Sequence, residues 1–313
     1  MALDTITTLS GDVKQFYDLN LLDNAFPNLV HTQWAQTRNI PGGTGRSMEF
    51  RRFGVLTAAT TPLTEGVVPA ETSMSVAAVT ATIDQYGAYL KGSDVLLMTA
   101  IDPLLEEYSE LLGAQMGDTI DQIVRDVLVA GTTVRYANGK GSRGDIASGD
   151  NVDTTELRKL LRTLENNNAR PVDDSGNFGL LIHPNVYYDI ISDTTVQNAL
   201  FYASARGNDN PMFTGEVGKF MGFVFVKSTN AKWFSGAGVS NNVDVYVTMA
   251  VGKDAYGITE LEGESVKTYY KAPGSAGTVD PLEMVWTYGW KLWFGAVRLN
   301  ENWMVRLESA VSG

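Results

Sequence analysis

The chain has 313 residues and no cysteine, which excludes disulfide bonds, thiolate metal sites and cysteine nucleophiles. Its length approaches the limit at which a single hydrophobic core stops growing, so two subdomains are expected. The formal net charge of −12 disfavours nucleic-acid binding as the main task, since proteins with that task present a basic face. The amino terminus lacks the basic segment of a signal peptide, and no apolar run approaches the ~20 residues that span a bilayer.

Residues 1–34 have the pattern of a polar amino-terminal arm. Its short apolar pieces, such as Phe16, Tyr17, Leu29 and Val30, are separated by asparagine, aspartate and proline. A segment of this composition cannot bury enough apolar surface to form its own core. We therefore expect the arm to lie along another surface.

Extended structure is predicted from Arg46 to Lys91. Met48 and Phe50 alternate with charged residues, and apolar residues from 79 to 83 alternate with threonine. Between these runs, residues 57–69 are rich in threonine, alanine, proline and glycine. The pattern predicts a long β-hairpin with an irregular distal part. A two-stranded hairpin is at best marginally stable in water, so this one needs a partner molecule to pack against.

The strongest local pattern is a helix over residues 101–130. Apolar residues recur at helical spacing, Asp102 suits the N-cap and Pro103 suits the first helical position. Gly131 is expected to end the helix. At ~1.5 Å per residue it is roughly 45 Å long, which is more than a small domain needs. We therefore expect it to act as a strut.

A loop or boundary is predicted over the glycine- and asparagine-rich residues 132–151, and helices and short strands are predicted after it. Asp153 and Glu156 have the pattern of a capping box, which opens a helix with leucines along one face. Short apolar strands are expected at 178–182, 220–226 and 243–251. One further helix is expected at 184–192.

The carboxy-terminal segment over residues 285–307 is aromatic and alternates as β-strands do. The residues expected on its buried face are Trp286, Tyr288, Trp290, Leu292 and Phe294. Few basic residues accompany the tryptophans, so we expect core or interface packing rather than stacking on bases or sugars.

Patterns for catalysis are weak. Only His31 and His183 are available for acid–base chemistry, and no Gly-x-Ser-x-Gly motif accompanies them. We expect His183 to have a structural or capping role. Residues 139–144 match a Gly-x-Gly-x-x-Gly phosphate loop in letters only, because no buried strand precedes them and no apolar helix follows, so a flexible surface loop is expected. The sequence predicts no enzyme, no cofactor and no metal site.

Three arginines before and within the first predicted strand stand out in a chain with few basic residues. They are either solvated charges or partners of an acidic surface on another subunit. The first turns of the long helix carry three glutamates, where the macrodipole also favours anions. The candidates for intersubunit contact are Arg46, Arg51, Arg52, Glu106, Glu107 and Glu110.

Five stretches are informative together: Leu29-Val-His-Thr-Gln-Trp-Ala-Gln36, Met48-Glu-Phe-Arg-Arg-Phe53, Thr61-Pro-Leu-Thr-Glu-Gly66, Gly215-Glu-Val-Gly-Lys-Phe-Met-Gly222 and Gly289-Trp-Lys-Leu-Trp-Phe294. With the order of the predicted parts, they resemble the major capsid proteins of tailed bacteriophages with the Hong Kong 97-type fold. The resemblance runs nearly end to end and is closer still to the Enquatrovirus-like (podovirus) branch.

The resemblance implies an α+β fold in five parts. They are an N-terminal arm over 1–34, an extension loop (the long β-hairpin) over 35–95, a peripheral domain over 96–151 with a spine helix over 101–130, an axial α/β domain over 152–245, and a return to peripheral-domain strands over 246–313. The implied extension loop reaches over a neighbouring subunit.

The function implied by the resemblance is that of a structural subunit, which self-assembles into the icosahedral head around packaged double-stranded DNA. The implied partners are copies of itself in hexamers and pentamers, a scaffold, a portal and decoration proteins. Contact with DNA is nonspecific proximity, and no membrane is involved. The implied location is the virion, after assembly in the host bacterial cytoplasm.

Two departures from the family are informative. Some relatives carry a long amino-terminal scaffolding segment, whereas here the arm starts at once, so a separate scaffold or the removal of such a segment is expected. Other relatives crosslink covalently through an extension-loop lysine. No lysine occurs between Lys14 and Lys91, so this chemistry is expected to be absent.

Three other functions fit parts of the sequence. An encapsulin-like nanocompartment shares the fold and would hold cargo enzymes instead of a genome. A hydrolase that uses His183 would lose its activity in His183→Ala. A monomeric adhesion module would bind a glycan through the tryptophan-rich strands.

Overall fold

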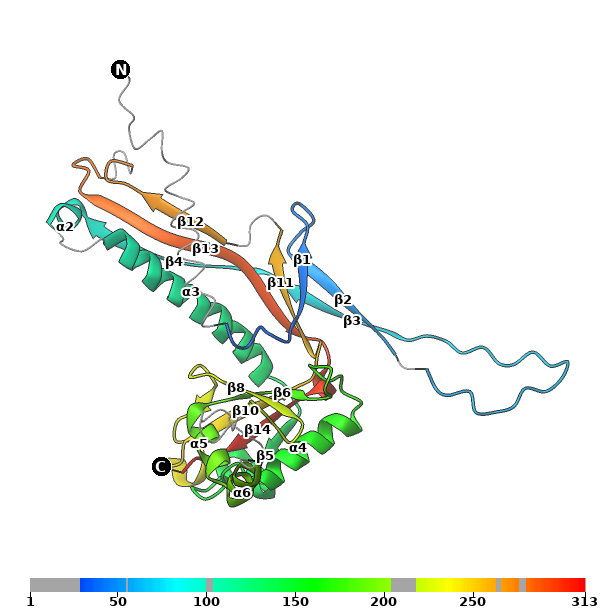
Figure 1. The fold of residues 1–313 in the computed structure, drawn as a ribbon. Helices are drawn as coiled ribbons and strands as arrows, with labels where there is room; N and C mark the ends of the chain where they lie inside the picture. The colour runs from blue at the N-terminus through cyan, green and yellow to red at the C-terminus, as the bar shows by residue number, and fades with distance from the viewer. Residues whose placement is uncertain are drawn as a thin grey trace.

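The computed structural model describes residues 29–54, 56–99, 104–203, 218–262, 266–275 and 280–312. Figure 1 shows an elongated layer in which a sheet lies along helix α3, a compact unit below it that contains the carboxy terminus, and a long hairpin that projects to one side. Helices and sheets are both present, so the predicted α+β class is confirmed.

A five-stranded sheet and a long helix form the elongated layer. The helix is α3 (Leu104–Val129), preceded by the short α2 (Asp94–Thr99). The strands are β1 (Gln36–Ile40), β4 (Asp84–Ser93), β11 (Tyr256–Leu261), β12 (Val266–Lys271) and β13 (Val285–Arg298). Their order is β1-β11-β13-β12, and β4 pairs with β13 as well.

The alternation in β13 explains how this layer is held together. The predicted inward residues Trp286, Tyr288, Trp290, Leu292 and Phe294 are all buried. They form one core with the apolar side of α3, which places a buried residue at each turn from Leu112 to Leu128. The predicted helix is thus confirmed over 104–129, while its expected cap at 102–103 lies outside the described residues.

A seven-stranded sheet forms the compact unit. Its strands are β5 (Val134–Tyr136), β6 (Phe178–Ile182), β7 (Lys219–Phe220), β8 (Phe223–Lys227), β9 (Trp233–Phe234), β10 (Val245–Val251) and β14 (Met304–Ser309). The order is β5-β14-β10-β6-β8-β7, with β9 paired to β10. The helices are α4 (Thr154–Asn166), α5 (Pro184–Ser192) and α6 (Thr194–Ala203), which share a second core with the sheet.

Local expectations for the compact unit are largely confirmed. Asp153 caps α4, because its carboxylate accepts a hydrogen bond of 2.8 Å from the Glu156 backbone N–H. The strand over 178–182 and the helix over 184–192 lie where they were predicted. The predicted strand over 220–226 is divided between β7 and β8 by a turn at Met221 and Gly222, both of which have positive φ.

Two expectations about the course of the chain differ from the structure. Residues 246–313 were expected to return to the peripheral layer, but β10 and β14 belong to the seven-stranded sheet. β14 lies between β5 and β10, and Met304, Val305 and Leu307 are all buried, as suits a central strand with both faces covered. Residues 132–151, expected to be a loop, include β5 and the 3-10 turns η2 (Ala137–Gly139) and η3 (Arg143–Asp145).

The predicted long β-hairpin is confirmed. β2 (Ser47–Phe53) pairs antiparallel with β3 (Val76–Thr82), and Phe50 lies opposite Val79. Phe50 and Ala81 are buried at the root of the hairpin. Residues 56–75 have no regular strand structure and are exposed throughout. The hairpin therefore has a packed root and a distal part without support from its own chain (Figure 1).

Candidate assembly surfaces

The distal hairpin exposes large apolar side chains. Val68 is 90% exposed and Leu63 is 76% exposed, and Leu56, Val67 and Met74 are also largely in water. At the distal end of the paired strands β2 and β3, the Gly54 backbone N–H donates to the Ser75 carbonyl at 2.8 Å. Beyond this hydrogen bond the hairpin has no regular strand structure. Because the burial of such side chains is favourable and the described chain does not cover them, the distal hairpin is a candidate interaction surface.

The three predicted arginines lie at the hairpin root with different surroundings. Arg46 pairs with Asp84 at 2.8 Å, and Arg51 pairs with Glu49 at 2.8 Å; all four side chains are largely exposed. Exposed pairs of this kind are weak and exchange partners readily. Arg52 is exposed and has no ion pair within the described part of the chain.

The three predicted glutamates lie on the first turns of α3. Glu106, Glu107 and Glu110 are all exposed, and none forms an ion pair with the residues that the structure describes. This end of α3 lies beside α2, at the far end of the layer from the hairpin root (Figure 1). The structure therefore does not bring the arginines and glutamates together within one chain.

His183 caps a helix, as predicted. Its Nδ1 accepts a hydrogen bond of 3.1 Å from the Asn185 backbone N–H at the start of α5, and its ring packs against Tyr246. Burial lowers the pKa of His183, which favours the neutral imidazole that this cap requires.

The glycine-rich segment over residues 139–144 is not a phosphate loop. Both guanidinium contacts of Arg143 go to the Glu308 carboxylate, each at 2.7 Å, and the guanidinium also stacks on Phe234. The segment was expected to be a flexible surface loop, but a bidentate ion pair to a fully buried acid ties it to β14. The residues that match the motif therefore form a turn that the ion pair of Arg143 holds against β14.

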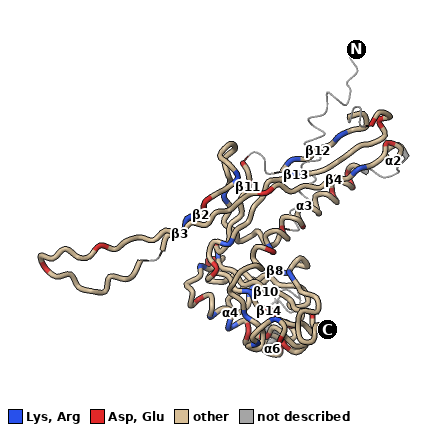
Figure 2. The backbone as a smooth tube through the Cα atoms, turned by 180° about the vertical axis from the view of Figure 1, so that it is seen from behind, with Lys and Arg blue, Asp and Glu red and all other residues tan. Residues whose placement is uncertain are grey.

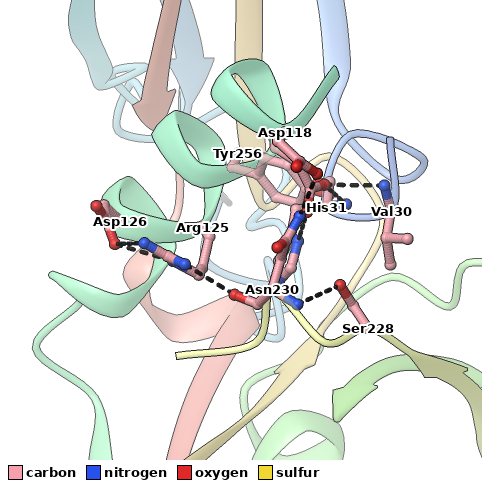
Figure 3. A network of polar contacts seen from close by, with 9 residues as sticks. Val30, His31, Asp118, Arg125, Asp126, Ser228, Asn230 and Tyr256 are labelled. Atoms are coloured by element: carbon pink, nitrogen blue, oxygen red, sulfur yellow. Dashed lines mark hydrogen bonds and ion pairs between the residues drawn. The ribbon is translucent and has the colours of Figure 1, made fainter. Parts of the chain in front are cut away.

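A buried polar network joins the amino-terminal arm to the rest of the molecule (Figure 3). Asp121 of α3 accepts hydrogen bonds from the backbone N–H groups of Val30 (2.8 Å) and His31 (2.7 Å), and its second oxygen lies 2.8 Å from His31 Nδ1. Tyr256 Oη donates to the His31 carbonyl at 2.5 Å. The sequence did not predict this network, because its partners are about ninety or more residues apart in the chain.

The same network reaches the compact unit. The Asn230 amide, in the loop after β8, donates to Asp118 (3.1 Å) and to Asp121 (3.3 Å). Arg125 of α3 donates to the Asn230 carbonyl at 2.9 Å. The network thus ties the arm, α3 and the compact unit at one point. The available signal was Asp121 itself, an acid three residues before Val124 and seven before Leu128, and so on the apolar side of the helix.

Electrostatics explain why Asp121 tolerates full burial. Burial alone raises the pKa of a carboxyl group, but hydrogen bonds and charge from His31, with a further hydrogen bond from Asn230, hold the pKa of Asp121 below its usual 3.8. For Tyr256, burial raises the pKa far above its usual value, so its hydroxyl remains a donor. Both carboxylate oxygens of Asp121 accept hydrogen bonds, so the network has a structural role that joins the arm, α3 and the compact unit.

Within the described ranges, no group of three or more histidine, aspartate or glutamate side chains is arranged to hold a metal ion. None of the helices in those ranges is both long enough and apolar enough to cross a membrane.

Comparisons with known proteins agree with this arrangement. Residues 76–307 match the family model described as phage capsid protein. No curated protein matches the sequence. The fold is similar to the capsid of Ralstonia phage GP4 (13% identity, 91% of this chain and 89% of that chain, TM-score 0.71). It is also similar to the capsid of cyanophage Pam1 (14% identity, 93% of this chain and 92% of that chain, TM-score 0.71). The capsid of cyanophage P-SCSP1u is similar as well (19% identity, 91% of this chain and 89% of that chain, TM-score 0.67).

Proposed function

Because the chain belongs to the phage capsid protein family, we infer that it acts as a major capsid protein, a structural subunit of the icosahedral head of a bacteriophage. The observation that carries this reading is the hairpin, whose distal residues 56–75 are exposed throughout and bear large apolar side chains. A subunit that works alone gains nothing from such a projection, whereas a shell subunit gains a surface to share with its neighbour.

We further propose that the hairpin packs over an adjacent copy, which makes the contact head-to-tail. The projecting hairpin and the elongated layer are different surfaces of one chain (Figure 1). Contacts between two different surfaces are heterologous, and they generate rings when the rotation between copies closes. Hexamers and pentamers are the rings that an icosahedral shell requires. Many weak contacts shared among many copies then give a stable container.

We propose that the arginines at the hairpin root contact the exposed glutamates in the first turns of α3 on a neighbouring copy. The arginines are Arg46, Arg51 and Arg52. What supports this is exposure and separation: both charge sets are exposed, and within one chain they lie at opposite ends of the layer. Arg52 is the strongest candidate, because Asp84 and Glu49 compete for Arg46 and Arg51. Such contacts supply specificity and register more than affinity.

The remaining partners are proposed on the same basis. A shell of this kind needs a scaffold to set its size and a portal for DNA, and it can carry decoration proteins. Packaged double-stranded DNA is an enclosed neighbour, which suits a chain of net charge −12 that has little general affinity for phosphates. Assembly is proposed to take place in the bacterial cytoplasm, and no catalytic activity is proposed.

The test is to shorten the hairpin. Residues 55–74 are replaced by Asn-Gly, which suits a tight turn between Gly54 and Ser75, already joined by a backbone hydrogen bond. We expect a folded chain with an unchanged circular dichroism spectrum that forms no closed shells in electron micrographs. A full-length variant with Leu63, Val67 and Val68 changed to serine separates loss of apolar contact from loss of length. Normal shells from both variants would contradict the proposal.

A further inference from the structure

A cavity lies where the hairpin root, β1 and the compact unit meet. It has a volume of about 550 Å³, and four arginines line it together with a single acid, Asp254. The arginines are Arg38, Arg51, Arg52 and Arg170. Only 24 of the 313 residues are lysine or arginine and the net charge is −12, so the cavity is a positive site on an acidic molecule. Figure 2 shows blue segments at the hairpin root and beside the compact unit.

Three of these arginines have no acceptor in the described part of the chain. No hydrogen bond or ion pair among the described residues reaches the guanidinium group of Arg38, Arg52 or Arg170. Arg51 has one acid, Glu49, at 2.8 Å. Like charges that line one cavity repel one another, and a single lining acid cannot neutralise four guanidinium groups. An anion in the cavity would relieve this repulsion and accept from the free N–H groups.

Aromatic neighbours restrict the positions of two of the guanidinium groups. Arg38 Cζ lies 5.1 Å from the ring centroid of Phe50, and Arg170 Cζ lies 5.5 Å from that of Trp303. The Phe50 ring is buried against Gly257, where a Cβ would lie 2.9 Å from it. A guanidinium group held over an aromatic ring keeps the N–H donors at its edge available. Two of the four arginines are therefore positioned before any ligand binds.

Backbone hydrogen bonds hold the wall that the compact unit contributes. The Arg170 carbonyl accepts from the Lys253 N–H at 2.9 Å, and the Gly252 N–H donates to the Trp303 carbonyl at 2.8 Å. The opposite wall comes from β1 and β2, which carry the other three arginines. A ligand in the cavity would therefore bridge the hairpin root, β1 and the segment that follows α4.

The number of free donors suits a phosphate group better than a carboxylate. A carboxylate has two oxygens and a single charge, and it matches the fork of one guanidinium group. A phosphate monoester presents three acceptor oxygens and a charge of about −1.5 to −2 at pH 7, so one group can accept from several arginines. Arginine is also the side chain best suited to bidentate recognition of phosphate.

We propose that this arginine cavity binds an anion that carries phosphate groups. The volume is that of a site for a small ligand, which favours a free polyphosphate or nucleotide. The phosphates of nucleic acid offer the same chemistry, and the test separates the two sources. The proposal concerns the single chain and goes beyond its role in assembly. Arg51 and Arg52 also belong to the proposed contact with a neighbouring copy, so the test variants leave both unchanged.

Calorimetric titration of the unassembled full-length chain with tripolyphosphate tests the proposal, at an ionic strength held constant with sodium chloride. We expect saturable binding and a melting temperature that rises by a few degrees, because the ligand binds the folded chain alone. Arg38→Gln with Arg170→Gln should weaken binding by roughly tenfold or more, since two charge-assisted contacts are lost. The matched control is Arg158→Gln with Arg162→Gln, which removes equal charge from exposed positions on α4 and should leave the affinity unchanged.

A second pair of changes keeps both charges in place. Arg38→Lys with Arg170→Lys retains the positive charge but removes the planar fork, so its affinity should fall between those of the unaltered chain and the glutamine pair. Thermal melting without ligand checks that each variant folds, and the lysine pair carries the test if the glutamine pair does not fold. Competition with a short DNA duplex identifies the source. A duplex that displaces tripolyphosphate assigns the cavity to nucleic-acid phosphates, and one that does not assigns it to a free anion.

Two results would overturn the proposal. Equal weakening of binding in the cavity variant and in the α4 control would show a general attraction between anions and arginines, with no site at the cavity. An unaltered chain that does not bind tripolyphosphate would also contradict it. If the Arg38→Gln, Arg170→Gln chain then folds but forms no particles, the cavity belongs to a contact between copies. Neither result bears on the capsid function, which particle formation by the unaltered chain tests separately.

Discussion

At the scale of single residues, Asp121 joins parts of the chain that are far apart in sequence. Its two oxygens accept from Val30, His31 and Asn230, which belong to the arm and to the loop after β8. A buried carboxylate is tolerated only with such a full set of partners. Residue patterns revealed the caps at Asp153 and His183, where donor and acceptor are neighbours in sequence. They did not reveal this network, because no local pattern encodes a partner ninety residues away.

Replacing Asp121 with asparagine should destabilise the chain in a pH-dependent way. The amide turns one acceptor into a donor that faces the donors of His31 and Asn230, at a cost of about 1–3 kcal/mol in the free energy of unfolding near pH 7. The pKa of Asp121 is held below 3.8 in the folded state. Its contribution to stability is therefore complete above the unfolded pKa and is lost as pH falls through the folded one.

Urea unfolding of both proteins from pH 7 down to pH 3 measures this. We expect the gap in unfolding free energy to narrow at the acidic end as the unaltered chain loses the contribution of Asp121. Asp174→Asn, a change at an exposed acid, serves as the control and should leave stability unchanged. A gap of constant size across the range would rule out a charged Asp121 as the source of the effect.

At the scale of elements, predictability followed the strength of the local pattern. The alternation of β13 and the apolar side of α3 were legible because each repeats over several turns or residues. β12 (Val266–Lys271) was missed because its core-facing side is short and threonine stands between Val266 and Tyr270, the two residues that pack on the core. The parallel pairing of β1 with β11 joins residues more than two hundred positions apart, for which one sequence holds no local signal.

Contact between β4 and β13 is close enough for one methyl group to disturb it. A Cβ on Gly92 would lie 2.4 Å from the indole of Trp286, which is fully buried and donates from Nε1 to the Ser93 carbonyl at 3.0 Å. Gly92→Ala should therefore cost about 1–3 kcal/mol through overpacking. Chemical unfolding, with Gly149→Ala as a control where a Cβ meets nothing within 4 Å, measures the difference. Equal stability of the two variants would mean that the indole moves aside freely.

At the scale of the whole molecule, function is distributed over surfaces that only a second copy can complete. The sequence indicated an unsupported hairpin and a strut, and both are present. The resemblance implied that residues 246–313 return to the peripheral layer, but β10 and β14 belong to the seven-stranded sheet, and burial on both faces of a strand does not reveal which sheet it joins. The exposed arginines lie at the hairpin root and the exposed glutamates at the start of α3, which are opposite ends of the elongated layer. Only the fold shows this separation, which makes a contact between copies the geometry that can bring the two charge sets together.

Charge reversal at the root tests that opposition. Arg51→Glu with Arg52→Glu should impair assembly and leave the monomer folded, since both side chains are exposed. Adding Glu106→Arg and Glu107→Arg should restore particles, as judged by sedimentation. Arg158→Glu, at another exposed arginine on α4, is the control. Normal particles from the arginine variant would show that the root charges are only solvated.

Mature particles should contain no covalent links between subunits. No lysine lies between Lys14 and Lys91, so the hairpin has no amine to form an isopeptide bond. We expect a single band near 34 kDa when particles are boiled in denaturant and run on a gel. A ladder of higher bands would contradict this and would require a crosslinking group elsewhere in the chain.

The central claim, that this chain works by assembling into a shell, is tested most directly by particle mass. Light scattering of the purified chain, alone and after co-expression with a candidate scaffold, measures it. The account predicts a narrow distribution of particles in the megadalton range, from which the copy number follows by division by the 34.0 kDa subunit mass. A monomer of 34.0 kDa that persists under both conditions would contradict it.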